Sequence, residues 1–240
     1  MIDPHKLNPS RWLAHRELVV LGVLCVMALG LWAFAEIADE VVEGERHVLD
    51  RKILLAMRSE GDPRDPLGPV WVEELVRDIT ALGGVVTLTV VTLSVSGYLL
   101  LCRKRRTLAF VLAAIVGGFV LSLGLKAAFG RPRPDLVPHA TAVHTASFPS
   151  AHSMLSAVAY LTLAALLAQV HPDRRIKIYM LSLGLMLTIL IGLSRIYLGV
   201  HWPTDVVAGW AAGAAWAALC WVTAWTIRNR DWLAMRFGRE

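Results

Sequence analysis

The chain has 240 residues, of which 56% are hydrophobic and 18% are charged, a balance far from that of a soluble globular domain. Its formal net charge of +5 does not indicate nucleic-acid binding, because the basic residues are spread over several short segments and do not gather with aromatic side chains. The composition therefore favours an integral membrane protein.

Six apolar segments approach the roughly 20 residues that a helix needs to cross the hydrocarbon layer of a membrane. They cover residues 18–36, 84–102, 107–128, 150–169, 176–194 and 205–227. The small residues Ala33 and Ala35 resemble a signal-peptide cleavage site, but the apolar run before them is longer than a typical signal core, which favours an uncleaved anchor. We expect an all-α membrane protein with six transmembrane helices in a single domain, residues 1–240.

A polar insert, residues 37–83, separates the first two spans. Apolar residues recur at helical spacing at two places in it: Leu49, Ile53, Ala56 and Met57, and then Trp71, Leu75 and Ile79. Gly and Pro residues between them, within 61–66, indicate a turn-rich linker. We therefore expect two short amphipathic helices that lie at the membrane interface.

Basic residues fall on one side of the six spans: in the amino-terminal segment, in 103–106, in 174–177 and in the carboxyl-terminal tail. Lys and Arg are enriched in short cytoplasmic loops, so both termini are expected in the cytoplasm. The insert and the loops 129–149 and 195–204 then lie at the outer face. The Gly and Ala residues of 209–215 favour close packing within one bundle over dimerisation, and they leave the oligomeric state open.

Three clusters of polar residues meet at this outer face. The first, residues 126–132, lies at the end of the third span and contains Lys126 and Arg131. A lysine within an apolar run is costly. Lys126 is therefore either a functional residue or a side chain that snorkels to the lipid headgroups.

The second cluster, residues 149–152, opens the fourth span. Ser150 suits the N-cap position of a helix, whose first backbone N–H groups have no partner inside the helix and attract anions. Taken alone, the segment is more simply a helix start with His152 at the interface.

The third cluster, residues 194–205, connects the last two spans and contains Arg195, His201 and Asp205. Because His201 and Asp205 are four positions apart, the carboxylate can hold one ring nitrogen and leave the other free. As an isolated pair they would more often form a structural hydrogen bond. Together, however, the three clusters place three cations, a helix start, two histidines and a carboxylate at one membrane face, which suits a phosphate group.

In order and spacing the clusters resemble the three-part signature of the type 2 phosphatidic acid phosphatase superfamily: Lys126 to Arg131-Pro132, Pro149-Ser150-Ala151-His152, and Ser194-Arg195 to His201 and Asp205. That superfamily includes bacterial membrane lipid phosphatases and is related to vanadium-dependent haloperoxidases. The resemblance extends from about residue 78 onward. Ala151 stands where the family has Gly. Because the atom needed there is a backbone N–H, the resemblance implies the same chemistry in a slightly narrower pocket.

The resemblance implies a role for each residue. His201 would attack phosphorus and become a phosphohistidine, Asp205 would hold its ring, and His152 would protonate the departing lipid oxygen. The phosphate oxygens would be bound by Lys126, Arg131, Ser150, Arg195 and the backbone N–H of Ala151.

A metal site is the weaker interpretation of the histidines His139, His144, His152 and His201. They lack His-x-x-x-His and paired-carboxylate spacing, and permanent cations already take the electrostatic role of a metal. We expect activity without metal or cofactor, resistant to chelators.

The sequence thus predicts a lipid phosphatase of a bacterial inner membrane, with its site at the external face. Undecaprenyl pyrophosphate, phosphatidylglycerol phosphate, phosphatidic acid and lipid A phosphates all suit the chemistry, and family analogy favours the first two. A phosphotransferase that passes the phosphoryl group from His201 to another lipid would share every motif. A transporter or non-enzymatic lipid-phosphate binder is less favoured, because transporters place charges near the midplane and often show repeated halves.

Overall fold

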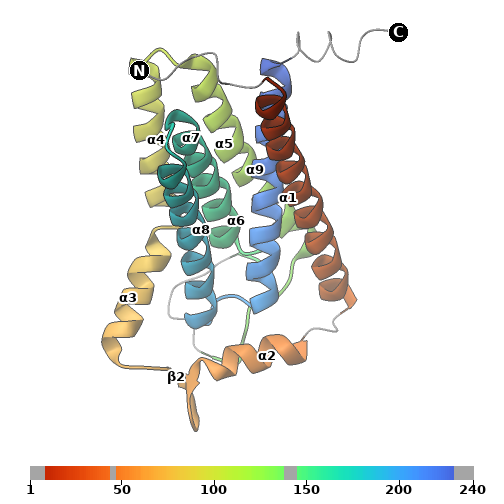
Figure 1. Cartoon of the computed structure of the whole chain (residues 1–240). Helices are drawn as coiled ribbons and strands as arrows, with labels where there is room; N and C mark the ends of the chain where they lie inside the picture. Colours follow the sequence, from red (N-terminus) through yellow and green to blue (C-terminus); the bar gives the residue numbers. More distant parts are fainter. Residues whose placement is uncertain (1–8, 44–46, 138–144, 230–240) are drawn as a thin grey trace.

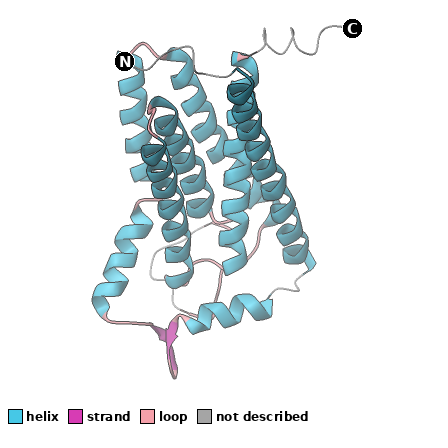
Figure 2. Ribbon diagram, viewed as in Figure 1, coloured by secondary structure: helices cyan, strands magenta, loops and turns pink. Residues whose placement is uncertain are grey.

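The computed structural model describes residues 9–43, 47–137 and 145–229, which form a bundle of long helices closed at one end by shorter elements (Figure 1; Figure 2). Helices dominate, as the apolar segments predict. The β-structure of the described residues is one small two-stranded sheet.

Five helical segments of the described residues are long and apolar enough to cross a membrane. They are α1 (Pro9–Glu43), α5 (Arg105–Phe129), α8 (Arg174–Tyr197), α9 (Pro203–Arg228) and the continuous run of α6 (Ala151–Ser156), the π-helical turn η2 (Ala157–Leu161) and α7 (Thr162–Val170). A sixth is present if α3 (Val70–Ala81) and α4 (Val85–Leu101), which meet at a bend of 45°, are counted as one broken span. The chain is thus a multi-pass membrane protein.

Gly83, in the turn between α3 and α4, approaches α8 closely. A Cβ atom at this position would lie 2.4 Å from the side chain of Ile191 in α8 and 3.4 Å from the ring of His152. Only glycine allows so close an approach. The bend therefore seats the α3–α4 turn against the first turn of α6.

The first helix is longer than the sequence predicts. It does not end near residue 36 but continues to Glu43. Ile37 and Ala38 are buried in a cluster with Phe148 and Ala208. Tertiary packing therefore holds the helix past its predicted end.

The insert contains both expected helices, α2 (His47–Ala56) and α3. The expected turn-rich linker lies within a short antiparallel hairpin that the sequence pattern did not predict, formed by β1 (Arg58–Ser59) and β2 (Asp62–Pro66). The N–H of Leu67 donates to the carbonyl of Met57 at 3.0 Å and closes the base of this hairpin. The strands are too short for their alternation to be visible in the sequence.

The last span packs against α6 almost backbone to backbone. A Cβ atom at Gly213 would lie 2.5 Å from the carbonyl oxygen of Met154, so a larger residue cannot stand there. This contact brings the starts of the two helices together, and the N–H of Ser150 donates to the carbonyl of Asp205 at 2.9 Å. The small residues of the last span thus serve packing within the chain.

The bundle has two chemically different ends (Figure 1). α1 begins and α9 ends at one of them, together with the connections from α4 to α5 and from α7 to α8, which carry the basic residues of 103–106 and 174–177. α2, the hairpin and the connections from α5 to α6 and from α8 to α9 lie at the opposite end. The three polar clusters therefore gather at the end away from the basic loops.

Candidate active site

Two buried residues at the start of α9, His201 and Asp205, form the centre of the site. Pro203 occupies the first helical position, where no N–H partner is needed, and Asp205 follows in the first turn. The carboxylate of Asp205 accepts the N–H of Trp202 at 2.9 Å and lies 3.4 Å from Nδ1 of His201. The helix start therefore fixes the geometry of this pair.

Hydrogen-bond partners define the state of the His201 ring. Nδ1 faces Oδ2 of Asp205 at 3.4 Å and Oγ of Ser147 at 3.3 Å, and the Ser147 hydroxyl itself donates to Asp205. Nε2 lies 3.2 Å from the guanidinium of Arg133, which can only donate. Nε2 is therefore the acceptor, and Nδ1 carries the proton. Burial lowers the pKa of His201 to about 3, outweighing the opposite effect of Asp205, so the ring is neutral near pH 7.

Arg131, a predicted phosphate ligand, is paired with two carboxylates in the structure. Its guanidinium is 6% exposed and pairs with Asp205 at 2.6 Å and with Asp50 at 2.9 Å. It also donates to the hydroxyl of Thr204 at 2.8 Å. Two carboxylates thus compensate its charge and engage both terminal nitrogens, although its buried Nε has no partner among the described residues, so it is a poor ligand for a substrate anion.

Arg133, two residues later, lies beside the ring of His201. Its guanidinium donates to the carbonyl of Val200 at 2.7 Å and to the carbonyl of Thr145 at 2.8 Å, and it faces Nε2 of His201. Burial lowers the pKa of Arg133, but a guanidinium stays charged at physiological pH. The Arg-Pro dipeptide occurs twice in succession here, so the sequence alone does not separate the two arginines.

Lys126 and Arg195 also point into the protein. Lys126, in the last turn of α5, donates to the carbonyl of Ala146 at 2.6 Å and is 7% exposed, which excludes snorkelling. Arg195, in the last turn of α8, donates to the hydroxyl of Thr80 at 3.0 Å. Its buried Nε has no partner among the described residues, and an anion bound beside it would satisfy this donor. We refer to Lys126, Arg133 and Arg195 as the cation cluster.

The second motif opens α6 beside this cluster. Ser150 is the N-cap, and its Oγ accepts the N–H of Ser153 at 3.4 Å. Ala151 begins the helix, so its N–H is one of the first donors that a helix leaves without an internal partner. His152, in the first turn of α6, lies close enough to the cation cluster and to His201 for electrostatic interaction with them. The structure thus brings the predicted site residues together, with Arg131 bound to Asp205 at 2.6 Å.

Asp50, in α2, belongs to the site, but no motif of the sequence indicated it. Its buried carboxylate accepts the N–H and the hydroxyl of Thr204 at 2.9 and 2.6 Å, in addition to its pair with Arg131. The apolar face expected for α2 included Leu49, but Leu49 is 55% exposed whereas Leu54 is fully buried. Asp50 and Leu54 are four positions apart and share the buried face. A carboxylate on an apolar helix face is the signal that would have revealed it.

Metal ligands are not gathered in the parts of the chain that the structure describes, where no three His, Cys, Asp or Glu side chains form a candidate group. His139 and His144 lie outside the described residues. Lys and Arg side chains supply the positive charge of the described site.

Comparison with known proteins points to one family. Residues 87–229, which include all three motifs but not Asp50, match the PAP2 superfamily. Phosphatidylglycerophosphatase B of Bacillus subtilis is 33% identical over 147 residues, which are 60% of this chain and 70% of the relative. The undecaprenyl-diphosphatase of Sulfolobus acidocaldarius is 29% identical over 133 residues, which are 52% of this chain and 59% of the relative. The crystal structure of a PAP2-type phosphatidylglycerolphosphate phosphatase from Bacillus subtilis aligns with a TM-score of 0.69 at 25% identity, covering 85% of this chain and 96% of that one.

Proposed function

Because the chain belongs to the PAP2 superfamily and is a membrane lipid phosphatase, we propose that it hydrolyses a lipid phosphate monoester or pyrophosphate through a phosphohistidine on His201. One observation carries the proposal: Nε2 of His201 lies 3.2 Å from the guanidinium of Arg133, a member of the cation cluster that can only donate. A phosphate bound by these cations would present its phosphorus to the lone pair of this ring nitrogen.

The reaction has two steps. The Nε2 lone pair of His201 forms a bond to phosphorus while the bond from phosphorus to the lipid oxygen breaks. His152 gives this oxygen its proton, so the lipid leaves as an alcohol, or as a lipid monophosphate if the substrate is a pyrophosphate. Asp205 stabilises the positive charge that develops on the His201 ring. Water then gives a proton to His152 and attacks the phosphohistidine, which releases inorganic phosphate and restores both histidines.

The partners of the cations decide which of them would bind phosphate. Among the described residues, the cation cluster is held by carbonyl, hydroxyl and neutral imidazole groups, so its charge stays available for an anion. Arg131 is neutralised by two carboxylates, and we therefore assign the phosphate to Arg133 in its place. Ser150 and the N–H of Ala151 complete the ligands at the start of α6. The roughly two negative charges of a bound phosphate would offset the positive charge of the cluster.

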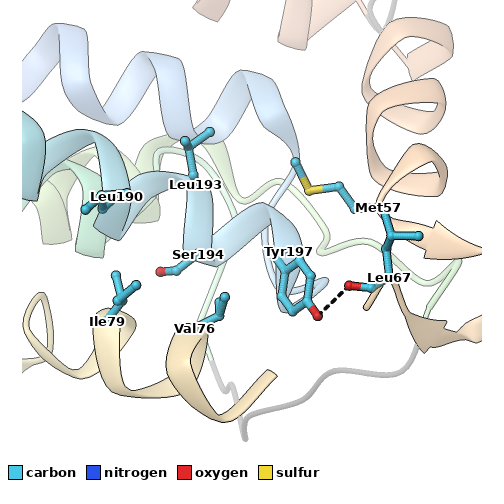
Figure 3. Close-up of a pocket in the computed structure, with 8 residues that line it drawn as sticks. All are labelled: Met57, Leu67, Val76, Ile79, Leu190, Leu193, Ser194 and Tyr197. Carbon is cyan, nitrogen blue, oxygen red and sulfur yellow. Dashed lines mark hydrogen bonds between the residues drawn. The ribbon is translucent and has the colours of Figure 1, made fainter. Parts of the chain in front are cut away.

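An apolar cavity beside the cation cluster suits the lipid chain. Its volume is about 230 Å³. It is lined mainly by apolar side chains of α3, α8 and the base of the hairpin (Figure 3). Ile79 and Ser194 line it. The residues that follow them, Thr80 and Arg195, are hydrogen bonded to each other, so the cavity adjoins the cluster. We assign to it the part of the lipid chain nearest the phosphate.

The relatives suggest two substrate classes. The names of the first two denote phosphatases of phosphatidylglycerol phosphate and of a polyprenyl pyrophosphate. We propose that this chain acts on one of these classes, in a bacterial inner membrane with both termini in the cytoplasm. The site would then face outward, because it lies at the end of the bundle away from the basic loops.

Phosphate release from these lipids tests the proposal. The purified chain should release phosphate from at least one of them in the presence of EDTA, because Lys and Arg take the role of a metal. His201→Ala should lose about 10²–10⁴-fold or more in rate. Equal release by both proteins would rule out His201 as nucleophile. With labelled substrate, label that moves to a second lipid instead of to water would identify a phosphotransferase.

A further inference from the structure

We propose that Asp50 is a positioning residue for the reaction: it neutralises Arg131, so that the charge of Asp205 remains available to His201, and it holds the start of α9. The inference rests on the proposed role of His201. Asp50 lies in α2, outside the residues 87–229 that match the family. In the described part of the chain its hydrogen bonds and ion pair are with Arg131 and Thr204, and none is with a proposed phosphate ligand.

The contacts of Asp50 form a closed network with the start of α9. One carboxylate oxygen accepts the N–H of Thr204 at 2.9 Å, and the other accepts the hydroxyl of Thr204 at 2.6 Å and the guanidinium of Arg131 at 2.9 Å. The N–H of Thr204 belongs to the first turn of α9, where donors have no partner within the helix and a negative charge is favourable. Asp50 thus caps α9 from another helix, one residue before Asp205.

The charges of this network explain why two carboxylates share one arginine. Arg131 bridges Asp50 at 2.9 Å and Asp205 at 2.6 Å, and all three side chains are buried. Two carboxylates and one guanidinium leave one negative charge beside Nδ1 of His201. Without Asp50, Arg131 would pair with Asp205 alone, and its positive charge would neutralise the carboxylate of Asp205. The ring of His201 would then lack a counter-charge for the positive charge that forms as it binds phosphorus.

Four variants and two measurements test this role. Asp50→Asn, Arg131→Gln and the double variant Asp50→Asn/Arg131→Gln are compared with Asp78→Asn, which removes one negative charge from an exposed position in α3. For each variant, kcat and KM are measured with a lipid that the unaltered chain hydrolyses, and the inhibition constant is measured for inorganic phosphate. Asp78→Asn should match the unaltered chain.

Asp50→Asn should lower kcat about 10- to 100-fold while KM and the inhibition constant of phosphate change less than about threefold. The double variant restores the single negative charge beside His201. It should therefore recover at least about fivefold in kcat relative to Asp50→Asn, a coupling that a purely structural loss would not produce. If Asp50→Asn does not fold, an active and folded double variant supports the role, and a folded but inactive one overturns it.

Three other outcomes contradict the inference. An unchanged kcat in Asp50→Asn would show that Asp205 does not need the second carboxylate. A double variant whose loss equals the product of the single losses would show two independent effects. In Arg131→Gln, the inhibition constant of phosphate could rise by as large a factor as kcat falls. This result would make Arg131 a phosphate ligand. An unaltered chain that releases no phosphate from any lipid would instead refute the proposed function itself.

Discussion

Arg131 and Arg133 are two residues apart and both are buried at least in part, yet different groups compensate their charges. Carboxylates surround Arg131, whereas Arg133 is held by carbonyl oxygens and by the ring of His201. A buried cation without a counter-charge is costly to the folded protein. Under the proposed function, the substrate would supply the missing negative charge at Arg133 when it binds.

This difference predicts the effect of Arg133→Gln. The variant should lose about 10²–10³-fold in kcat/KM, as expected for removal of a charged donor to the reacting phosphate. The inhibition constant of inorganic phosphate should rise, because the ground-state anion uses the same donor. Steady-state kinetics measure both quantities, with Arg64→Gln, an exposed arginine of the hairpin, as the control. Normal affinity for phosphate in Arg133→Gln would argue against direct contact.

The buried ring of His201 makes the stability of the chain depend on pH. Burial lowers its pKa from the ordinary 6.5 to about 3. Between these values the unfolded chain binds a proton that the folded chain does not, so the free energy of unfolding falls as the pH drops from 6.5 toward 3. The melting temperature in detergent should therefore fall more between about pH 7 and about pH 5 in the unaltered chain than in His201→Gln. A parallel fall in both would assign the pH dependence to other groups.

The motifs predicted most residues of the site because helix starts and ends are local features. Ser150 at an N-cap and His201 and Asp205 around Pro203 follow from spacing along the chain. The roles of Arg131 and Arg133 do not, because the choice between them depends on which of them meets the carboxylate of Asp50, a residue far away in the sequence. A contact of this kind exists only once the helices are packed.

At the scale of whole elements, membrane thickness made the long helices predictable. An apolar run near the required length has few alternatives to a helix in lipid, because every backbone polar group must be satisfied internally. The insert obeys no such constraint. Its helix α2 presents Leu54 and Asp50 to the bundle instead of Leu49, and its linker pairs as a hairpin, since contacts with the bundle decide both features.

The cavity between α3 and α8 should make the activity depend on the length of the lipid chain. Leu193→Trp would fill this cavity, so kcat/KM should fall about tenfold for a long-chain lipid phosphate and stay constant for a water-soluble short-chain ester with the same headgroup. Leu185→Trp introduces the same side chain at an exposed position of α8, outside the cavity, and should change neither value. Equal losses of Leu193→Trp on both substrates would mean damage to the site and not to a chain subsite.

At the scale of the whole molecule, the two ends of the bundle differ in charge and in function. One end carries the short basic connections, and the other carries the site, with α2 and the hairpin beside it (Figure 1). A substrate with its tail in lipid and its phosphate in water reaches such a site from the membrane surface. The basic loops set the orientation of the protein in the membrane. Because the site lies at the opposite end, this orientation also decides from which leaflet the substrate comes.

Cysteine labelling in spheroplasts tests this orientation. The starting variant lacks Cys25, Cys102 and Cys220. Two proteins are made from it, each with a single new cysteine at an exposed position: Arg64→Cys in the hairpin at one end, and Lys104→Cys in a basic loop at the other. The basic loops should be retained in the cytoplasm, so a membrane-impermeant maleimide should label Arg64→Cys in intact spheroplasts and Lys104→Cys only after permeabilisation. Activity of each variant on added lipid confirms that the fold is intact. The reverse pattern of labelling would place the site in the cytoplasm, where its substrate would have to come from the inner leaflet.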